Sequence, residues 1–264
     1  MYQFHAIAAG VVSGLVLAFA MVNQVQGQSK GVKNIVLVHG AFADGSSWAK
    51  VIPLLEAKGL NVTAVQNPLS SLKDDVDAAK RAIALMDGPV LLVGHSWGGV
   101  VISEAGNDPK VAGLLYVAAF APDNGQSLAD VAQAFPPAPG SDEVRPDAFG
   151  FVSLTPKGIH TDFAQDLPES ERKIILATQG SWSAKAPSEK ISNAAWRTKP
   201  SWYIVARQDR MIVPDLQRKM AKTIKATTLE LNTSHVPMVS QPEKVAGFII
   251  DASQTVSTKA LVAK

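Results

Sequence analysis

The sequence predicts an α/β fold built on a doubly wound, mostly parallel sheet with helices on both faces. Short runs of consecutive apolar residues, 35–38 and 90–93, end in glycine and are typical of parallel strands buried on both faces. Amphipathic stretches of helical length separate such runs, so a β-α-β alternation recurs along the chain. The composition agrees with a globular domain, because 47% of the 264 residues are apolar and 18% are charged.

The elements of the first half follow from periodicity and caps. Residues 48–58 carry apolar side chains at helical spacing and stop at Gly59, which predicts a helix with a glycine cap. The acidic pair Asp74 and Asp75 opens the next helical stretch. The elements expected here are strand 35–38, helix 48–58, strand 61–66, helix 72–86, strand 90–93, a helix from 99 through 104 and strand 111–118.

The second half resumes the alternation after an interruption. Its expected elements are strand 202–206, helix 214–224, strand 228–231 and helix 242–252. Between the halves, residues 122–168 hold seven of the sixteen prolines, so no regular strand-helix unit is expected there. A helical stretch, 169–179, and Trp182 follow. We expect residues 122–197, approximately, to form a lid over the carboxyl edge of the sheet, where open α/β sheets bind ligands.

The N-terminus has the features of an export signal. Residues 1–27 contain no Lys, Arg, Asp or Glu, and residues 6–22 are apolar apart from Ser13. This apolar stretch is shorter than the roughly 20 residues of a spanning helix, and a small-x-small site at 25–27 follows it. The prediction is a signal peptide over 1–27 that leaves residues 28–264 as an exported protein, periplasmic or secreted. An uncleaved N-terminal membrane anchor is the alternative.

Charge and cysteine content exclude several function classes. The 25 Lys and Arg against 23 Asp and Glu give a net charge of +2, without a long run of like charge. No nucleic-acid footprint is therefore visible. The absence of cysteine excludes a disulfide scaffold, a thiolate metal site and a cysteine nucleophile.

The catalytic hypothesis rests on residues 94–99, which read GHSWGG. They follow the predicted strand 90–93 directly and precede a predicted helix, the strand-turn-helix setting of a G-x-S-x-G nucleophile. The glycines remove side chains where the backbone turns sharply. The turn places Ser96 at a helix N-terminus, where amide groups favour developing negative charge. A phosphate-binding loop would need the spacing G-x-x-x-x-G-K, which is absent. Ser96 is the predicted nucleophile.

A serine nucleophile needs a base, and His235 is the predicted one. It follows the expected strand 228–231 at the carboxyl edge of the sheet. The other histidines lie in the N-terminal segment, at a strand end, inside the GHSWGG turn and in the lid: His5, His39, His95 and His160.

Asp209, which follows strand 202–206 within three residues, is the predicted acid that orients the base. The order serine, acid, histidine matches that of G-x-S-x-G hydrolases. Two alternatives stay open. Asp123, after the preceding strand, is the second candidate for the acid. Asp209 is otherwise a surface partner of Arg207 or Arg210.

Catalysis by a serine nucleophile also needs donors for the oxyanion that forms, and two are expected here. The backbone N–H of Trp97 is one, and the N–H of Ala41, in the loop after the first strand, is the other. His39, at the start of that loop, is expected to hold it through hydrogen bonds of its ring rather than to act on substrate.

Three segments carry a resemblance to a known family: 38–48 (VHGAFADGSSW), 94–99 (GHSWGG) and 208–210 (QDR). They resemble the α/β-hydrolase superfamily, and more narrowly the bacterial carboxylesterases related to pyrethroid hydrolases, plant methylesterases and hydroxynitrile lyases. The resemblance covers nearly the whole chain after the N-terminal segment. It implies hydrolysis of carboxylic esters without a cofactor or a metal. A hydroxynitrile-lyase-like enzyme is an alternative within this group. Its lyases typically carry Thr after the first-loop His and Lys after the catalytic His, where this chain has Gly40 and Val236, so the groups that would handle cyanide are missing.

Two function classes follow from these residues. In a serine esterase Ser96 attacks the ester carbonyl, His235 moves the proton and water releases the acyl group. A non-catalytic protein that binds a small ligand in the same lidded pocket is the other class, and the complete set of Ser, His and Asp favours the enzyme. The expected substrate is a small apolar or aromatic ester that contacts Phe42 and Trp182. Other aromatic side chains are candidates for either the pocket wall or ordinary core: Trp97, Phe120, Phe135, Phe149 and Phe151.

Overall fold

A computed structural model describes Met1 and residues 31–256 of the chain. The predicted signal peptide or anchor, residues 1–27, lies outside the described residues apart from Met1. Within 31–256, none of the helices combines the length and the apolar character needed to cross a lipid bilayer.

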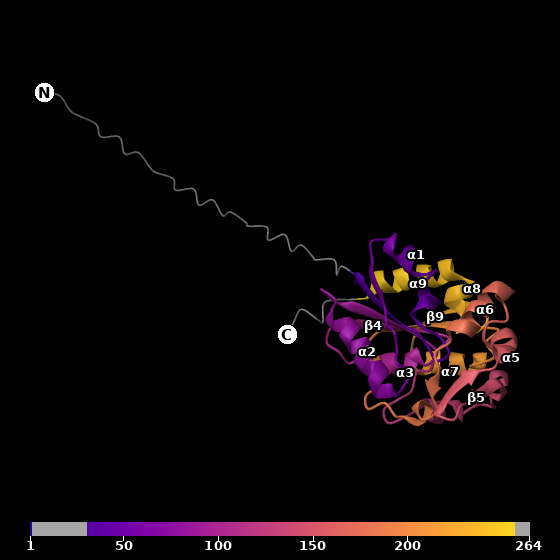
Figure 1. The fold of residues 1–264 in the computed structure, drawn as a ribbon. Coiled ribbons are helices and arrows are strands. Elements are labelled where there is room, and N and C mark those ends of the chain that lie inside the picture. Colours follow the sequence, from indigo (N-terminus) through magenta and orange to yellow (C-terminus); the bar gives the residue numbers. More distant parts are fainter. Residues whose placement is uncertain (2–30, 257–264) are drawn as a thin grey trace.

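A parallel sheet lies at the centre of the molecule (Figure 1). It has six strands in the order β2-β1-β3-β4-β8-β9. The chain starts at β1, moves to the edge strand β2 and then crosses back to β3, so the predicted doubly wound sheet is confirmed. The strands are β1 Asn34–Val38, β2 Asn61–Ala64, β3 Val90–His95, β4 Val111–Val117, β8 Ser201–Ala206 and β9 Thr227–Leu231. All residues of the four inner strands are buried, as the continuous apolar runs predict.

Helices cover both faces of this sheet. Helix α1 (Ile52–Glu56) packs against α9 (Pro242–Thr255), and α2 (Leu72–Ala84) packs against α3 (Gly98–Ala105). Figure 1 shows the first pair above the sheet and the second pair below it, together with α7 (Pro214–Thr223).

The predicted helix 48–58 is wrong in its extent. Helix α1 covers only Ile52–Glu56, and a separate 3-10 turn, η1 (Gly45–Trp48), precedes it. Pro53 has no N–H to donate, so it fits only the first turn of the helix. The Asp44 side chain accepts a hydrogen bond from the Ser46 N–H and caps the 3-10 turn.

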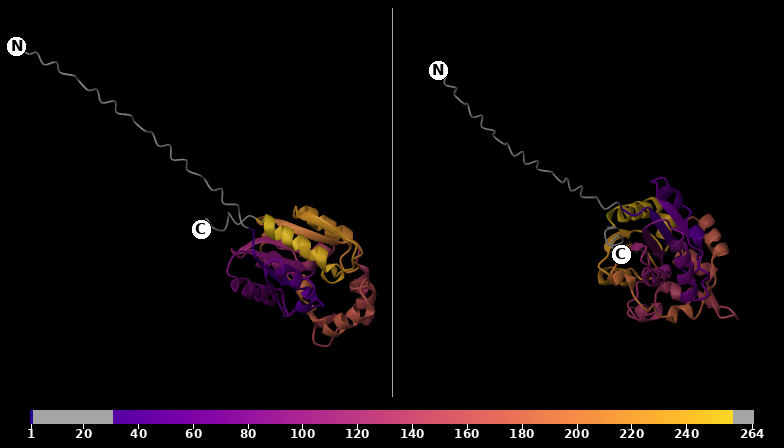
Figure 2. Two further views of the ribbon diagram at one scale, coloured as in Figure 1. Left: turned by 90° about the horizontal axis from the view of Figure 1, so that it is seen from above. Right: turned by 90° about the vertical axis from the view of Figure 1, so that its left-hand side faces the viewer.

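The segment inserted between β4 and β8 folds into short helices and a small antiparallel sheet in the order β5-β6-β7. Figure 2 shows it gathered at one end of the large sheet. Its elements are α4 Leu128–Ala132, η2 Pro139–Glu143, β5 Val144–Pro146, β6 Phe151–Leu154, α5 Pro156–Gly158, η3 Ile159–Phe163, α6 Glu169–Thr178, β7 Trp182–Ser183, η4 Ala186–Ser188 and η5 Ala195–Arg197. A last short helix, α8 (Pro237–Ser240), follows β9.

As expected, residues 122–168 contribute no strand-helix unit to the parallel sheet, and their regular elements are short helices and an antiparallel hairpin. Prolines in this segment occupy positions that tolerate them. Pro139 and Pro156 begin η2 and α5, where the missing N–H would have no partner inside the helix. Pro146 lies in β5, an edge strand of the small sheet. These prolines lie at the ends of short elements.

Candidate active site

The turn between β3 and α3 presents Ser96 as predicted from its sequence. Ser96 has a φ of +52°, a left-handed conformation that is strained for a residue with a side chain. The sharp turn leaves no room for side chains at the glycines that flank Ser96. A Cβ atom at Gly94 would lie 2.5 Å from the Gly98 carbonyl oxygen, and one at Gly98 would lie 2.6 Å from that of Val38. The two glycines are therefore required for this backbone path.

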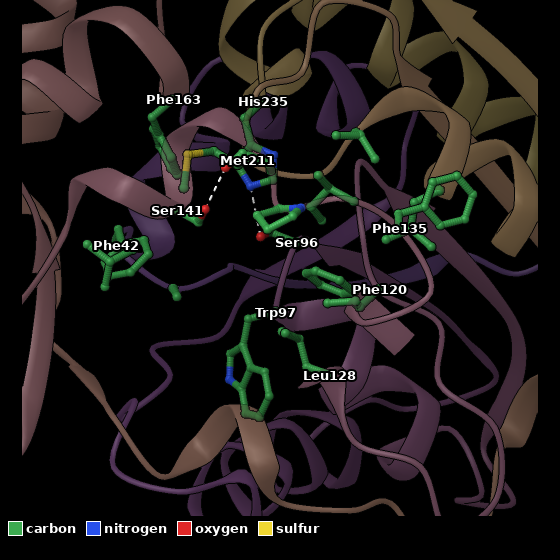
Figure 3. A pocket seen from close by; sticks show the side chains of 18 of the residues that line it. Phe42, Ser96, Trp97, Phe120, Leu128, Phe135, Ser141, Phe163, Met211 and His235 are labelled. Carbon is green, nitrogen blue, oxygen red and sulfur yellow. Dashed lines mark hydrogen bonds between the residues drawn. The ribbon is translucent and has the colours of Figure 1, made fainter. Parts of the chain in front are cut away.

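The structure brings together the three residues predicted to do the chemistry. The Oγ of Ser96 lies 2.8 Å from Nε2 of His235, an interaction drawn as a dashed line in Figure 3. The Nδ1 of the same ring lies 2.7 Å from Oδ2 of Asp209. All three residues are buried, and Ser96 and His235 line a pocket. A hydrogen-bonded path thus runs from a buried carboxylate through an imidazole to a hydroxyl.

The Asp209 carboxylate is fully partnered. Its Oδ1 accepts the backbone N–H of Met211 at 2.7 Å and that of Ile212 at 2.9 Å. Its Oδ2 accepts the side-chain amide of Gln217 at 2.7 Å, beside the His235 ring. Four donors therefore hold the carboxylate in one orientation and compensate for its burial.

The alternatives for the acid lie elsewhere. Asp123 forms a surface ion pair with Arg197, with 2.6 Å between Oδ1 and Nε, and this hydrogen bond lowers the pKa of its carboxyl. The two arginines beside Asp209 pair with other carboxylates, Arg207 with Glu230 and Arg210 with Asp162.

Two buried histidines support the site without joining the path. The Nε2 of His95 donates to the backbone carbonyl of His235 over 2.8 Å, and burial lowers the pKa of His95 well below its usual range. The His39 ring donates from Nδ1 to the Gly40 carbonyl and accepts the Asn67 N–H on Nε2, at 2.8 and 2.9 Å. Burial lowers the pKa of His39 too. As predicted, ring hydrogen bonds of His39 hold the loop after β1.

The two predicted oxyanion donors lie on neighbouring strand ends. Strands β1 and β3 pair in parallel with Val38 opposite Gly94, so the loop that follows each strand emerges at the same edge. Ala41, Trp97 and Ser96 line one pocket. Within residues 31–256, the N–H groups of Ala41 and Trp97 donate to no protein acceptor. They are available to a ligand atom.

The pocket has a volume of about 380 Å³ and a mainly apolar wall. Figure 3 shows Ser96 and His235 between Phe42 on one side and Phe120 and Phe135 on the other. The two residues predicted to contact substrate both line it, and the Phe42 ring lies edge-on to that of Trp182 with 5.9 Å between centroids.

Not every aromatic candidate reaches the pocket. Trp97, Phe120 and Phe135 line it, whereas Phe149 and Phe151 do not. Phe149 is 87% exposed because it lies in the turn between β5 and β6, next to Gly150 with a φ of +84°. The hairpin carries this ring into solvent.

Sequence reasoning missed two buried polar residues of the site. Gln217 on α7 is fully buried and bridges the Ala206 N–H, the Ile212 carbonyl and Asp209. Asp75 on α2 is also fully buried and accepts the indole N–H of Trp97. The sequence signal that could have identified both residues is a polar side chain on the apolar face of an amphipathic helix. No group of three or more His, Asp or Glu side chains in the described part of the chain is placed to bind a metal.

Known proteins are similar in sequence to this chain over most of its length. Methylesterase 2 of Arabidopsis thaliana is 28% identical over 259 residues, covering 84% of this chain and 97% of that protein. A pyrethroid hydrolase of Sphingobium wenxiniae is 29% identical over 252 residues, covering 83% of this chain and 87% of that protein. An alpha-hydroxynitrile lyase of Arabidopsis thaliana is 26% identical over 241 residues, covering 80% and 93%.

Solved structures have the same fold. The crystal structure of a pyrethroid hydrolase from Sphingobium faniae JZ-2 matches with a TM-score of 0.72 at 23% identity, over 84% of this chain and 98% of that one. The profile of the Alpha/beta hydrolase family matches residues 35–248. The resemblance carried by the three sequence motifs is therefore confirmed, and the chain belongs to the alpha/beta hydrolase family.

Proposed function

We propose that this protein hydrolyses carboxylic esters through an acyl-enzyme intermediate on Ser96. The observation that carries the proposal is the hydrogen-bonded path from Asp209 through His235 to Ser96, which ends in a pocket beside two backbone N–H groups without a protein acceptor. Esterases are prominent among the relatives, including the methylesterase and the pyrethroid hydrolase.

Each group has one task in this mechanism. The Ser96 Oγ attacks the ester carbonyl while His235 Nε2 takes its proton, and Asp209 stabilises the imidazolium that forms. The N–H groups of Ala41 and Trp97 stabilise the oxyanion of the tetrahedral intermediate. His235 then returns the proton to the leaving alkoxide. In deacylation, water attacks the acyl-enzyme while His235 takes a proton from it. His235 then returns the proton to the Ser96 Oγ as the carboxylic acid leaves.

The wall of the pocket favours an apolar or aromatic ester. Its aromatic side chains come both from the core domain, as with Phe42, and from the inserted segment, as with Phe135 and Trp182. An apolar wall gains free energy from the hydrophobic parts of a substrate and offers little to a charged one. Residues 122–197 would act as the lid that closes over the bound acyl group.

A hydroxynitrile-lyase activity is the second candidate, because one relative is such a lyase. Two positions speak against it. Lyases of the group typically carry Thr and Lys where this chain has Gly40 and Val236. A Cβ atom at Gly40 would lie 2.7 Å from that of Ser96 and 3.0 Å from the His95 carbonyl oxygen. A side chain at position 40 would therefore require the loop or the nucleophile to move.

Export of the protein is part of the proposal. The uncharged N-terminal segment with its small-x-small site at 25–27 supports cleavage near Gln28. Mass spectrometry of the protein from its native host tests this. A mature N-terminus near Gln28 supports export with cleavage, whereas an intact N-terminus in the membrane fraction supports the anchor.

Active-site labelling tests the catalytic proposal. A fluorophosphonate probe should label the folded protein at Ser96, and Ser96→Ala should abolish both labelling and hydrolysis of p-nitrophenyl butyrate. Ser141→Ala is the matched control, because Ser141 lines the same pocket but its hydroxyl donates to the Ala138 carbonyl instead of a histidine. A folded wild-type protein that neither labels nor hydrolyses any ester would favour the ligand-binding alternative.

A further inference from the structure

The mechanism does not use Asp75, although this carboxylate lies directly behind the nucleophile turn. We propose that Asp75 is a positioning residue that fixes the indole of Trp97 and, through it, the wall that selects the acyl group. This proposal rests on the proposed esterase function and adds a specificity determinant to it.

The contacts of Asp75 are few and directional. Its Oδ2 accepts the indole N–H of Trp97 at 2.7 Å, and its Oδ1 accepts the backbone N–H of Leu69 at 2.8 Å. The side chain lies on the buried face of α2, with no cation paired to it among the described residues. Burial raises the pKa of Asp75 to about 6, which reflects the cost of keeping a carboxylate away from water. A buried carboxylate that costs stability needs a reason, and its two donors indicate one.

The first donor belongs to the pocket. Trp97 follows Ser96 directly and offers its backbone N–H as a proposed oxyanion donor. Its indole packs on the Trp182 ring with 5.1 Å between centroids, and Trp182 in turn meets the edge of Phe42 at 5.9 Å. All three rings line the pocket. An indole free to change rotamer would therefore displace the neighbouring rings.

The second donor leads to the same wall by a separate path. Leu69 has a φ of +59°, a left-handed conformation that a leucine adopts only when its surroundings hold it. The Asp75 carboxylate holds its N–H, and its carbonyl accepts the N–H of Ser183 at 2.8 Å. Ser183 is the residue after Trp182. Asp75 thus holds the Trp182 ring in place through the Trp97 indole, and it holds the backbone next to Trp182 in place through the Leu69 turn.

Substitution by Asn separates this role from simple packing. The Asp75 carboxylate accepts one N–H group on each of its two oxygens, whereas the Asn amide has only one oxygen. The amide can therefore accept only one of these N–H groups, and its NH₂ group faces the other. The Trp97 indole or the Leu69 turn then loses its acceptor. Without these hydrogen bonds the pocket wall can shift, and bulky acyl groups then bind in unproductive poses. The rate with an acetyl ester should fall less, because the acetyl group barely reaches the wall.

The experiment compares kcat/KM for p-nitrophenyl acetate and p-nitrophenyl 3-phenylpropionate in the wild type and four variants: Asp75→Asn, Asp77→Asn, Trp97→Phe and the double variant of Asp75→Asn with Trp97→Phe. In Asp75→Asn we expect the ratio of phenylpropionate to acetate to change by about tenfold, within the range for pocket contacts. Asp77→Asn is the matched control on the exposed side of the same helix, where the carboxylate pairs with Lys73, and its ratio should stay at the wild-type value.

Trp97→Phe removes the indole donor itself and should change the ratio in its own right. Adding Asp75→Asn to Trp97→Phe should change the ratio by less than Asp75→Asn does alone, because the shared contact is already gone. The single variant Trp97→Phe also keeps the proposal testable should Asp75→Asn fail to fold. In that case the ratio of Trp97→Phe alone is decisive, and an unchanged ratio overturns the proposal.

Two results would contradict the role of Asp75: an unchanged ratio in Asp75→Asn, whether or not both esters lose activity equally, or full additivity in the double variant. An equal loss would mean that Asp75 supports only the fold. Failure of the esterase proposal looks different, because the wild type itself would then hydrolyse neither ester and would not label at Ser96. That outcome would overturn both proposals.

Discussion

Replacing Asp209 by Asn tests the proposed chemistry most directly, because it replaces one carboxylate oxygen by an NH₂ group, removes the negative charge and leaves the shape of the site intact. All four partners of this carboxylate are donors: two backbone N–H groups on Oδ1, and the Gln217 amide with the His235 ring on Oδ2. An amide presents one acceptor and one donor. Its oxygen should stay with the two backbone N–H groups, which cannot rotate, so its NH₂ faces His235.

The imidazole must then change tautomer. With an NH₂ group facing it, Nδ1 of His235 becomes an acceptor, and the proton moves to Nε2, which faces Ser96 at 2.8 Å. A protonated Nε2 cannot take the proton of the serine. The same substitution in serine proteases lowers kcat by about 10⁴-fold, which corresponds to about 5 kcal/mol of transition-state free energy.

The assay is steady-state hydrolysis of p-nitrophenyl butyrate, together with circular dichroism to verify the fold. We expect kcat of Asp209→Asn to fall by about 10³ to 10⁴-fold. Asp123→Asn is the control, because the Asp123 carboxylate lies at the surface and interacts with Arg197 and the Asn124 N–H, and the kcat of this variant should stay within about twofold of wild type. A kcat of Asp209→Asn within tenfold of wild type, or a larger loss for Asp123→Asn, would refute the assignment of the acid.

Three further predictions follow from buried groups of the site. Gln217→Leu removes three buried hydrogen bonds, and the free energy of unfolding in urea should fall by about 2–5 kcal/mol; a loss below about 1 kcal/mol would contradict the bridging role. The lowered pKa of His39 means that the unfolded chain takes up a proton near pH 6.5 before the folded one does, so this residue makes stability fall as pH drops below 6.5. In His39→Gln the slope of unfolding free energy against pH between 7 and 5 should be shallower, by at most about 1.4 kcal/mol per pH unit, and an unchanged slope would contradict the buried neutral ring. Trp182→Ala should change relative kcat/KM among esters of different acyl size by about 10- to 200-fold while acetate stays within about tenfold, and a uniform loss would assign Trp182 to the fold instead.

Local signals in the sequence were sufficient for the sheet and the nucleophile. The inner strands could be predicted because burial on both faces requires an unbroken apolar run, as at 35–38 and 90–93. Ser96 could be predicted because the sharp turn needs glycine at 94 and 98, and this requirement acts within a few residues. The strand ends then limited the choice of base and acid, because parallel strands deliver their following loops to one edge.

Long-range packing decided the rest. Whether Asp209 or Asp123 reaches His235 depends on which strand end faces the ring, and the sequence allowed both. The sequence did not predict the pairing of β5 with β6 within residues 122–168, because prolines lie at the ends of these short elements. The pairing is evident only in the structure, where each strand lies beside its partner. The roles of Asp75 and Gln217 depend on hydrogen-bond partners 22 and 8 residues away in the chain, the donor Trp97 and the acceptor Asp209 respectively. A sequence pattern records that a polar residue lies on a buried helix face, but only the tertiary structure supplies the partner that its burial requires.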